Sequence, residues 1–227
     1  MRKALIIVAH PDDEVLGMGG TLAKLSNKGV ETHLMIVTDG SSSQYRSANN
    51  LEQIISRKKK ETQQSADTLG IKSVIYGDLP DMKLDCVPHL EINAVIEKTI
   101  RELKPDTVFT HFYGDVNLDH RRVFESVMVA CRPTQEQSVR NVYCFEVPSS
   151  TEWNAVSEHT VFIPNFFVNI DGFLKTKMKA LSFYETELRP FPHPRSLASV
   201  EKTSMAEGIK VGFPAVERFV LIRQLDD

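Results

Sequence analysis

The sequence predicts an α/β fold in which helices cover both faces of a mostly parallel sheet. Apolar segments of strand length alternate with helical segments along most of the chain, as expected where each helix crosses back between parallel strands. The first apolar segment, KALIIVA at 3–9, is continuously hydrophobic, which is typical of a strand buried on both faces. A length of 227 residues suits one domain, residues 1–227, with room for a full sheet and its helices.

Strands and helices alternate regularly in the first half of the chain. A helix is expected over 14–28, where Leu16, Leu22 and Leu25 supply an apolar face and Gly29 ends the helix. The following segments are expected to be strand 32–38, loop 41–50, helix 51–68, strand 73–77, helix 87–103 and strand 106–111.

The second half has a weaker periodicity, and its expected elements are correspondingly less regular. They are helix 119–131, strand 140–147, strand 160–170, helix 172–184, a Pro-rich turn at 189–194, a helix near 196–208 and a last strand at 218–223.

The composition is that of a soluble globular protein, with 41% hydrophobic and 25% charged residues. The net charge is −3 without a basic stripe, so no nucleic-acid partner is expected, and we interpret the basic run 57–60 as a solvated helix face. Cys86, Cys131 and Cys144 form no CxxC pair, which argues against a disulfide framework and a thiolate zinc site. No segment is long and apolar enough for a signal peptide or a membrane span, so a cytoplasmic protein is expected.

Two clusters of histidine and acidic residues follow the first and fourth strands. The first is HPDDE at 10–14, and the second is His111 with GDVNLDHRR at 114–122. If the strand order is 3-2-1-4, strands one and four are neighbours where the order reverses, which is where ligands bind in open α/β sheets. Three consecutive acids at the end of a buried strand are costly without a counter-charge. The two clusters are therefore expected to face each other around a cation.

The residue types in these clusters match a catalytic zinc site, which has three protein ligands and one position left for water. His10 and Asp13 can bend to one ion from a strand-to-helix turn, and His120 can supply the third ligand. Asp12 then remains as the base that takes a proton from the activated water. Taken singly, each residue also has a structural reading, since Asp at a helix start is a common cap and Asp119 could cap its own helix. The two facing clusters favour the metal.

At these residues the sequence resembles a known family. AHPDDEVLG at 9–17 and GDVNLDHR at 114–121 resemble the two specific motifs of the LmbE-like, or PIG-L, de-N-acetylases. Weaker matches are TDG at 38–40, LPDM at 79–82, PHPRS at 192–196 and GFPAVERF at 212–219.

The resemblance implies a three-layer Rossmann-like (LmbE-like) fold and a zinc-dependent hydrolase. Its substrate would be a small acetylated amino sugar of the N-acetylglucosamine type, or a conjugate, deacetylated by attack of metal-activated water on the amide. The resemblance also implies His10, Asp13 and His120 as zinc ligands and Asp12 as general base, in agreement with the reading above. A homo-oligomer is a further expectation.

The second motif departs from the family pattern at one position. Many members read His-x-Asp-His, whereas this chain has Asn117 in place of the first histidine. An asparagine can donate a hydrogen bond but cannot deliver a proton. The proton for the leaving amine must therefore come from another residue, and the candidates are Asp12, His193 and His111. We hypothesise that His193 supplies the second electrophile, the alternative being a turn histidine that packs on its flanking prolines.

The remaining site predictions concern substrate binding and ligand orientation. Asp119 is expected to accept from a ligand histidine, and His111 to lie beside the ligands. Arg57 or Lys58 with Glu61 resembles the family's Arg-x-x-Glu motif, since Arg57 has the residue type and Lys58 has the spacing. The predicted substrate-binding residues are Arg57, Asp81, Asn117 and Arg195, in a shallow site rimmed by loops 41–50 and 112–118.

Three other interpretations concern the same part of the sequence. The same ligands would serve a metal-dependent hydrolase of an ester or phosphoester, and a non-catalytic metal- or sugar-binding protein would leave Asp12 without a purpose. Gly17, Gly19 and Gly20 lack the spacing of a dinucleotide loop and are expected to allow close helix packing instead.

Overall fold

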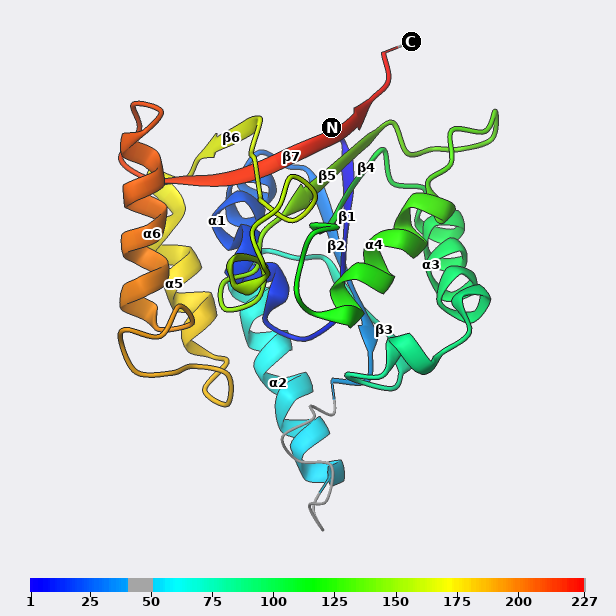
Figure 1. Cartoon of the computed structure of the whole chain (residues 1–227), viewed down its shortest axis with the longest axis horizontal. Coiled ribbons are helices and arrows are strands. Elements are labelled where there is room, and N and C mark those ends of the chain that lie inside the picture. The colour runs from blue at the N-terminus through cyan, green and yellow to red at the C-terminus, as the bar shows by residue number, and fades with distance from the viewer. Residues whose placement is uncertain (41–50, 227) are drawn as a thin grey trace.

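A computed structural model describes residues 1–40 and 51–226, and its centre is a seven-stranded sheet in the order β3-β2-β1-β4-β5-β7-β6 (Figure 1). Strands β1 to β5 pair in parallel, and β7 pairs antiparallel with both β5 and β6. The strands are β1 Lys3–Val8, β2 Glu31–Thr38, β3 Ser73–Leu79, β4 Thr107–His111, β5 Asn141–Phe145, β6 Phe166–Asn169 and β7 Val216–Gln224. The predicted mostly parallel sheet and its 3-2-1-4 order are confirmed.

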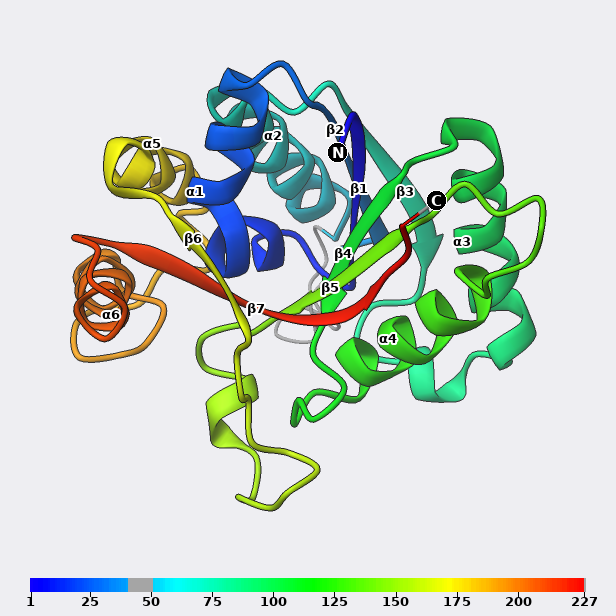
Figure 2. The same ribbon diagram turned by 90° about the horizontal axis from the view of Figure 1, so that it is seen from above.

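Helices cover both faces of this sheet, which completes the predicted three layers. Helices α1, α2 and α5 lie on one face, and α3 and α4 lie on the other (Figure 2). The helices are α1 Asp13–Asn27, α2 Leu51–Leu69, α3 His89–Leu103, α4 Leu118–Ala130, α5 Leu174–Ser182 and α6 Leu197–Ile209, with short 3-10 turns at Leu84–Cys86, Thr151–Trp153 and Asp171–Phe173.

The unbroken apolar sequence of β1 has a simple explanation in these layers. Alternate side chains of a strand point to opposite faces of a sheet. Ala4, Ile6 and Val8 belong to the core under α1 and α2, whereas Leu5 and Ile7 belong to the core under α3 and α4. Both faces are buried, so neither set of positions carries a polar residue.

One predicted element is wrong, while the other described elements begin and end within two residues of their predicted bounds. The expected strand at 160–170 is reduced to β6, Phe166–Asn169. The N–H groups of Thr160 and Val161 donate to the carbonyl of Ser157, so this part of the chain is a turn. Pro164 then lacks the N–H that a strand would need for pairing.

Three predictions lie beyond these observations. Loop 41–50, expected at the rim of the site, lies outside the described residues. Within residues 1–40 and 51–226, no helix has the length and apolar character needed to cross a membrane. The cytoplasmic location and the homo-oligomer stay predictions.

Candidate metal centre

The two predicted clusters meet at the carboxyl ends of β1 and β4. These strands are direct neighbours in parallel register, with Ile7 opposite Thr110. Just beyond them, the backbone N–H of Ala9 donates to Nε2 of His111 over 2.8 Å. The turn after β1 is thereby fixed against the end of β4, and the loop 112–117 leads directly into α4 with His120.

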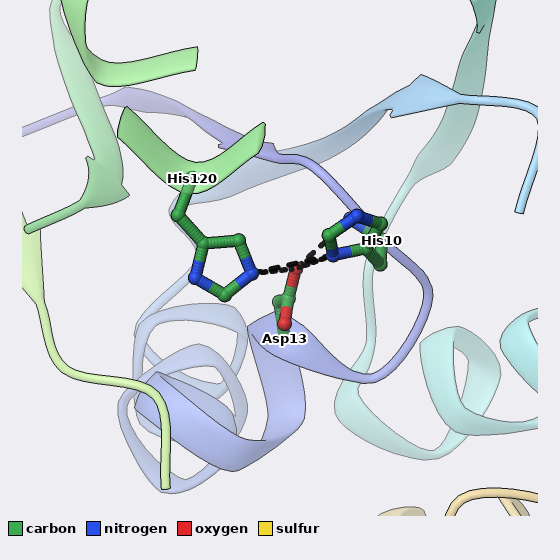
Figure 3. A group of neighbouring side chains, drawn as sticks. All are labelled: His10, Asp13 and His120. Carbon is green, nitrogen blue, oxygen red and sulfur yellow. Dashed lines mark hydrogen bonds and ion pairs between the residues drawn. The ribbon is translucent and has the colours of Figure 1, made fainter. Parts of the chain in front are cut away.

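His10, Asp13 and His120 direct three ligand atoms at one point (Figure 3). Nδ1 of His10 lies 3.2 Å from Nε2 of His120, and each of these nitrogens lies 3.4 Å from Oδ2 of Asp13. An ion with tetrahedral bonds of about 2.0–2.1 Å holds its ligand atoms roughly 3.3–3.4 Å apart. The three atoms therefore have the mutual spacing of three corners of a zinc tetrahedron, and the donor set fits that ion.

The charges around these side chains favour a cation. Burial lowers the pKa of His120, but Asp13 and Asp115 raise it to about 9. Burial likewise opposes the charged form of His10, yet hydrogen bonds that its imidazole donates to the carboxylates of Asp119 and Asp13 raise its pKa well above the usual value. Burial raises the pKa of Asp13, whereas the imidazoles of His120 and His111 bring it well below the usual range. Positive charge is thus stabilised at the position where the three ligand atoms converge.

Each candidate histidine ligand meets a carboxylate at its other ring nitrogen. Oδ2 of Asp119 lies 3.1 Å from Nε2 of His10, and its Oδ1 accepts from the backbone N–H of Leu84. Oδ2 of Asp115 lies 3.1 Å from Nδ1 of His120. Such carboxylates fix the tautomer and the ring orientation of metal-binding histidines.

Asp115 was missed by the sequence reasoning, although it lies inside the quoted GDVNLDHR motif. Its carboxylate also accepts from the hydroxyls of Ser150 and Thr151 and from the backbone N–H of Asn117. Its position five residues before His120 was the available signal, but only the folded loop brings it back to the ring.

Asp81 also reaches His10, with Oδ1 3.3 Å from the same Nε2 that Asp119 contacts. His10, Asp81 and Asp119 are close enough to form a second group of metal-binding type. One Nε2–H of His10 can donate to Asp119, and the carboxylate of Asp81 lines the pocket described below.

Asp12 has an unusual backbone conformation next to the candidate ligands. Its φ is 93° and its ψ is −23°, a left-handed region that costs energy for any residue other than glycine. In the described part of the chain its side chain makes no capping hydrogen bond to α1 and is 2% exposed, which argues against the simple cap reading. Burial raises its pKa well above the usual value, against the opposing charge of Arg195. A buried carboxylate of raised basicity beside the ligands is suited to accept a proton.

Asn117, rather than Asp119, caps helix α4. Its side-chain oxygen accepts from the backbone N–H of Asp119 over 2.9 Å, and its Nδ2 lies 3.7 Å from Sδ of Met82. Capping by Asn117 leaves the Asp119 carboxylate free to contact His10, as predicted for an orienting acceptor.

A pocket of about 180 Å³ opens over these residues. Its lining includes three of the predicted substrate-binding residues together with two charged side chains that were not predicted there. The lining residues are His10, Pro11, Asp12, Gly40, Lys58, Asp81, Met82, Asn117, Glu187 and Arg195.

A chain of ion pairs forms one wall of this pocket. Nη1 of Arg195 lies 3.3 Å from Oδ2 of Asp12 and 3.5 Å from Oε2 of Glu187, while Lys58 contacts the other oxygen of Glu187 at 2.7 Å. Arg57 is not among the lining residues that the structure describes, because its guanidinium pairs with Glu61 and Glu185. Of the two residues considered for the family's helix motif, Lys58, which has its spacing to Glu61, is the one that lines the pocket.

His111 and His193, the two histidines proposed as proton sources, are not among the pocket-lining residues in the described part of the chain, although Nε2 of His111 lies 3.4 Å from Oδ2 of Asp13. His111 is buried, stacks on His120 at 3.9 Å between ring centroids, and has its pKa lowered to about 3 by burial and by the charge of His120. Nδ1 of His193 accepts from the backbone N–H of Arg195, and its ring meets Trp153 edge to face. The roles of His111 and His193 in proton transfer stay predictions.

Two deacetylases of N-acetylated sugars are among the proteins similar to this chain. The chain is 28% identical to the diacetylchitobiose deacetylase of Thermococcus kodakarensis over 197 residues, covering 82% of this chain and 70% of the relative. The N,N'-diacetylchitobiose deacetylase structure from Pyrococcus horikoshii matches with a TM-score of 0.79 and 25% identity, covering 98% of this chain and 84% of that one.

The fold is shared more widely than this activity. GalB, a 4-carboxy-2-hydroxymuconate hydratase from Pseudomonas putida KT2440, matches with a TM-score of 0.80, 17% identity and coverage of 100% of this chain and 98% of its own. Fold alone therefore does not decide the reaction. The sequence is decisive for the family: residues 5–131 match the PIG-L family, described as GlcNAc-PI de-N-acetylase, and the chain belongs to it.

Proposed function

We propose that this chain is a zinc-dependent hydrolase that removes the acetyl group from an N-acetylated amino sugar or its conjugate. The observation that carries the proposal is the triangle of His10, Asp13 and His120, with its zinc-like spacing, beside the buried carboxylate of Asp12. The similarity to two diacetylchitobiose deacetylases supports the choice of an acetamide over an ester or a phosphoester.

His10, Asp13 and His120 would hold the zinc ion. When bound, zinc lowers the pKa of water and polarises the carbonyl of the substrate. Asp119 and Asp115 keep the two imidazoles in the tautomers that leave Nδ1 of His10 and Nε2 of His120 free to ligate.

Asp12 would carry the proton through the reaction. Its carboxylate accepts a proton from the attacking water and returns it to the amine nitrogen as the amide C–N bond breaks, which yields acetate and a free amine. Arg195 holds this carboxylate at 3.3 Å. Because Asn117 supplies no proton, we assign both steps to Asp12, which lines the pocket beside the ligands, and we keep His193 as the predicted second electrophile.

The rest of the pocket would bind the sugar. Asp81 can accept from sugar hydroxyls, while Lys58 and the side-chain amide of Asn117 can donate to them. A polar pocket of about 180 Å³ suits a single sugar ring better than a long apolar chain. The predicted contribution of Arg57 would then be indirect, through its ion pair with Glu61 on the same helix face.

The test is a deacetylation screen with zinc-loaded protein over N-acetylated sugars that are free, phosphorylated or nucleotide-linked. Acetate and primary amine should appear in equal amounts, and Asp12→Asn should stop their release while zinc remains bound. Hydrolysis of esters or phosphoesters without any acetamide turnover would contradict the proposed reaction. Sugar binding without turnover, unchanged in Asp12→Asn, would indicate a binding protein.

A further inference from the structure

Helix α1, which begins with the proposed catalytic turn, is broken near its start. Met18 has φ −147° and ψ 24°, which separates a first segment at 13–17 from the rest of the helix. The first segment is little more than one turn long, and it carries Asp13 and follows directly on Asp12. So short a helical segment does not hold itself in place, because the nucleation of a helix is unfavourable.

A buried ion pair is inserted at this break. In an unbroken helix the N–H of Gly20 would donate to the carbonyl of Leu16. Here the N–H of Gly20 donates to Oε1 of Glu217 over 2.9 Å, and the carbonyl of Leu16 accepts from Nζ of Lys177 over 3.0 Å. Nζ of Lys177 lies 2.6 Å from Oε1 of Glu217, so the ion pair bridges the carbonyl of Leu16 and the N–H of Gly20.

The second carboxylate oxygen of Glu217 also accepts a backbone hydrogen bond from α1. Oε2 accepts from the backbone N–H of Thr21 over 2.6 Å, so one carboxylate holds two N–H groups at the start of the second segment. These are the donors that a phosphate-binding loop would offer, and here the chain's own carboxylate occupies them.

Two glycines that follow the first motif, Gly19 and Gly20, make room for this arrangement. A Cβ atom on Gly19 would lie 3.1 Å from Cγ of Lys177, and one on Gly20 would lie within 3.0 Å of three atoms of Ile170. Their predicted role in close helix packing is therefore consistent with the structure. The packing partners are Ile170, which directly follows β6, and Lys177 in α5.

We propose that Lys177 and Glu217 are positioning residues, which set the orientation of the short segment that carries Asp12 and Asp13. Lys177 comes from α5 and Glu217 from β7, and both are at least 96% buried. A buried ion pair gains little stability over apolar packing, because both charges lose their hydration. This pair instead supplies hydrogen bonds of fixed direction. Lys177 donates to the carbonyl of Leu16 before the break, and the two oxygens of Glu217 accept from the N–H groups of Gly20 and Thr21 after it. The inference rests on the proposed function, since that function gives Asp12 and Asp13 their roles.

The experiment compares Lys177→Met and Glu217→Gln with a matched control, Lys24→Met, on helix α1 itself. Nζ of Lys24 donates to the carbonyl of Asn169 over 2.7 Å, so Lys24→Met removes a similar lysine–carbonyl bond, but from the second segment of α1. Zinc affinity is measured by competition with a chromophoric chelator, and kcat and KM by acetate release, all at a temperature where circular dichroism shows every variant folded.

We expect Lys177→Met and Glu217→Gln to bind zinc about tenfold to a hundredfold more weakly and to lose kcat, with KM nearly unchanged and Lys24→Met close to wild type. Lys177→Arg, which keeps the donor and the charge, should recover part of the loss. Wild-type zinc affinity and kcat in both variants, with only a lower Tm, would overturn the inference. An equal loss in Lys24→Met would also overturn it, since the effect would then follow from any loosening of α1.

Amide hydrogen exchange gives a readout that needs neither zinc nor substrate. The peptide covering residues 12–18 should exchange faster in Lys177→Met and Glu217→Gln, and at the wild-type rate in Lys24→Met. If wild-type protein bound no zinc or released no acetate, the proposed function would fail, while this comparison would still decide whether the pair holds the segment.

Discussion

Asp115 offers a sharp test of the proposed metal centre, because it touches His120 from the side away from the other ligands. Its Oδ2 lies 3.1 Å from Nδ1 of His120, and each of the two side chains is 1% exposed. Bulk water does not reach the carboxylate at so buried a position. We expect Asp115→Asn and Asp115→Ala to weaken zinc binding, the second more than the first.

The size of the loss follows from the kind of bond that is removed. A hydrogen bond to a charged group contributes about 1.5–3 kcal/mol, which corresponds to roughly 10–150-fold in affinity. Asparagine keeps an acceptor oxygen but loses the charge, so Asp115→Asn should lie near tenfold. Alanine removes the acceptor altogether, so Asp115→Ala should lie near a hundredfold.

Zinc competition against a chromophoric chelator measures both variants, with Ser150→Ala as control. Ser150 donates to Oδ1 of Asp115, so its removal disturbs the same carboxylate without touching Oδ2 or His120. Zinc affinity within twofold of wild type in Asp115→Ala, at a temperature where the protein is folded, would refute the assigned role. An equal loss in Ser150→Ala would show that the whole loop, rather than the contact to His120, determines affinity.

Three further outcomes are expected. Asp12→Asn should lower kcat by about 10²–10⁴-fold with one zinc per chain retained, as checked by acetate release and metal analysis; a smaller loss would mean that another base operates. Arg195→Met removes the positive charge that keeps the pKa of Asp12 from rising further, so Asp12 should stay protonated to higher pH. The acid limb of the pH profile of kcat/KM should therefore shift to higher pH. An acid limb that stays in place or shifts to lower pH would contradict this pairing. Gly17→Ala would place a Cβ atom 2.2 Å from Cδ2 of Phe145, which should cost about 1–3 kcal/mol in the free energy of unfolding by denaturant, and a neutral effect would show that Phe145 can move away.

Much of the fold and the core of the site followed from the order of residues along the chain. The continuous hydrophobic sequence of β1 indicated burial on both faces, and its alternate side chains do enter two separate cores. The position of HPDDE and of GDVNLDHR directly after two strands predicted that the clusters would meet, since parallel strands end at one edge of the sheet. The segment 160–170 misled this reading, because its apolar residues form a turn before the strand begins at Phe166.

The sequence alone thus determined the alternation of buried strands with helices and the two clusters that follow the first and fourth strands, because hydrophobic periodicity and chain direction are local properties. Tertiary structure decided the partners that come from distant parts of the chain. Arg195 reaches Asp12 from beyond α5 and is itself paired with Glu187. Glu217 reaches the break in α1 from the last strand, nearly two hundred residues away in sequence. No local pattern encodes such contacts, since they depend on how α5, α6 and β7 pack against the first helix.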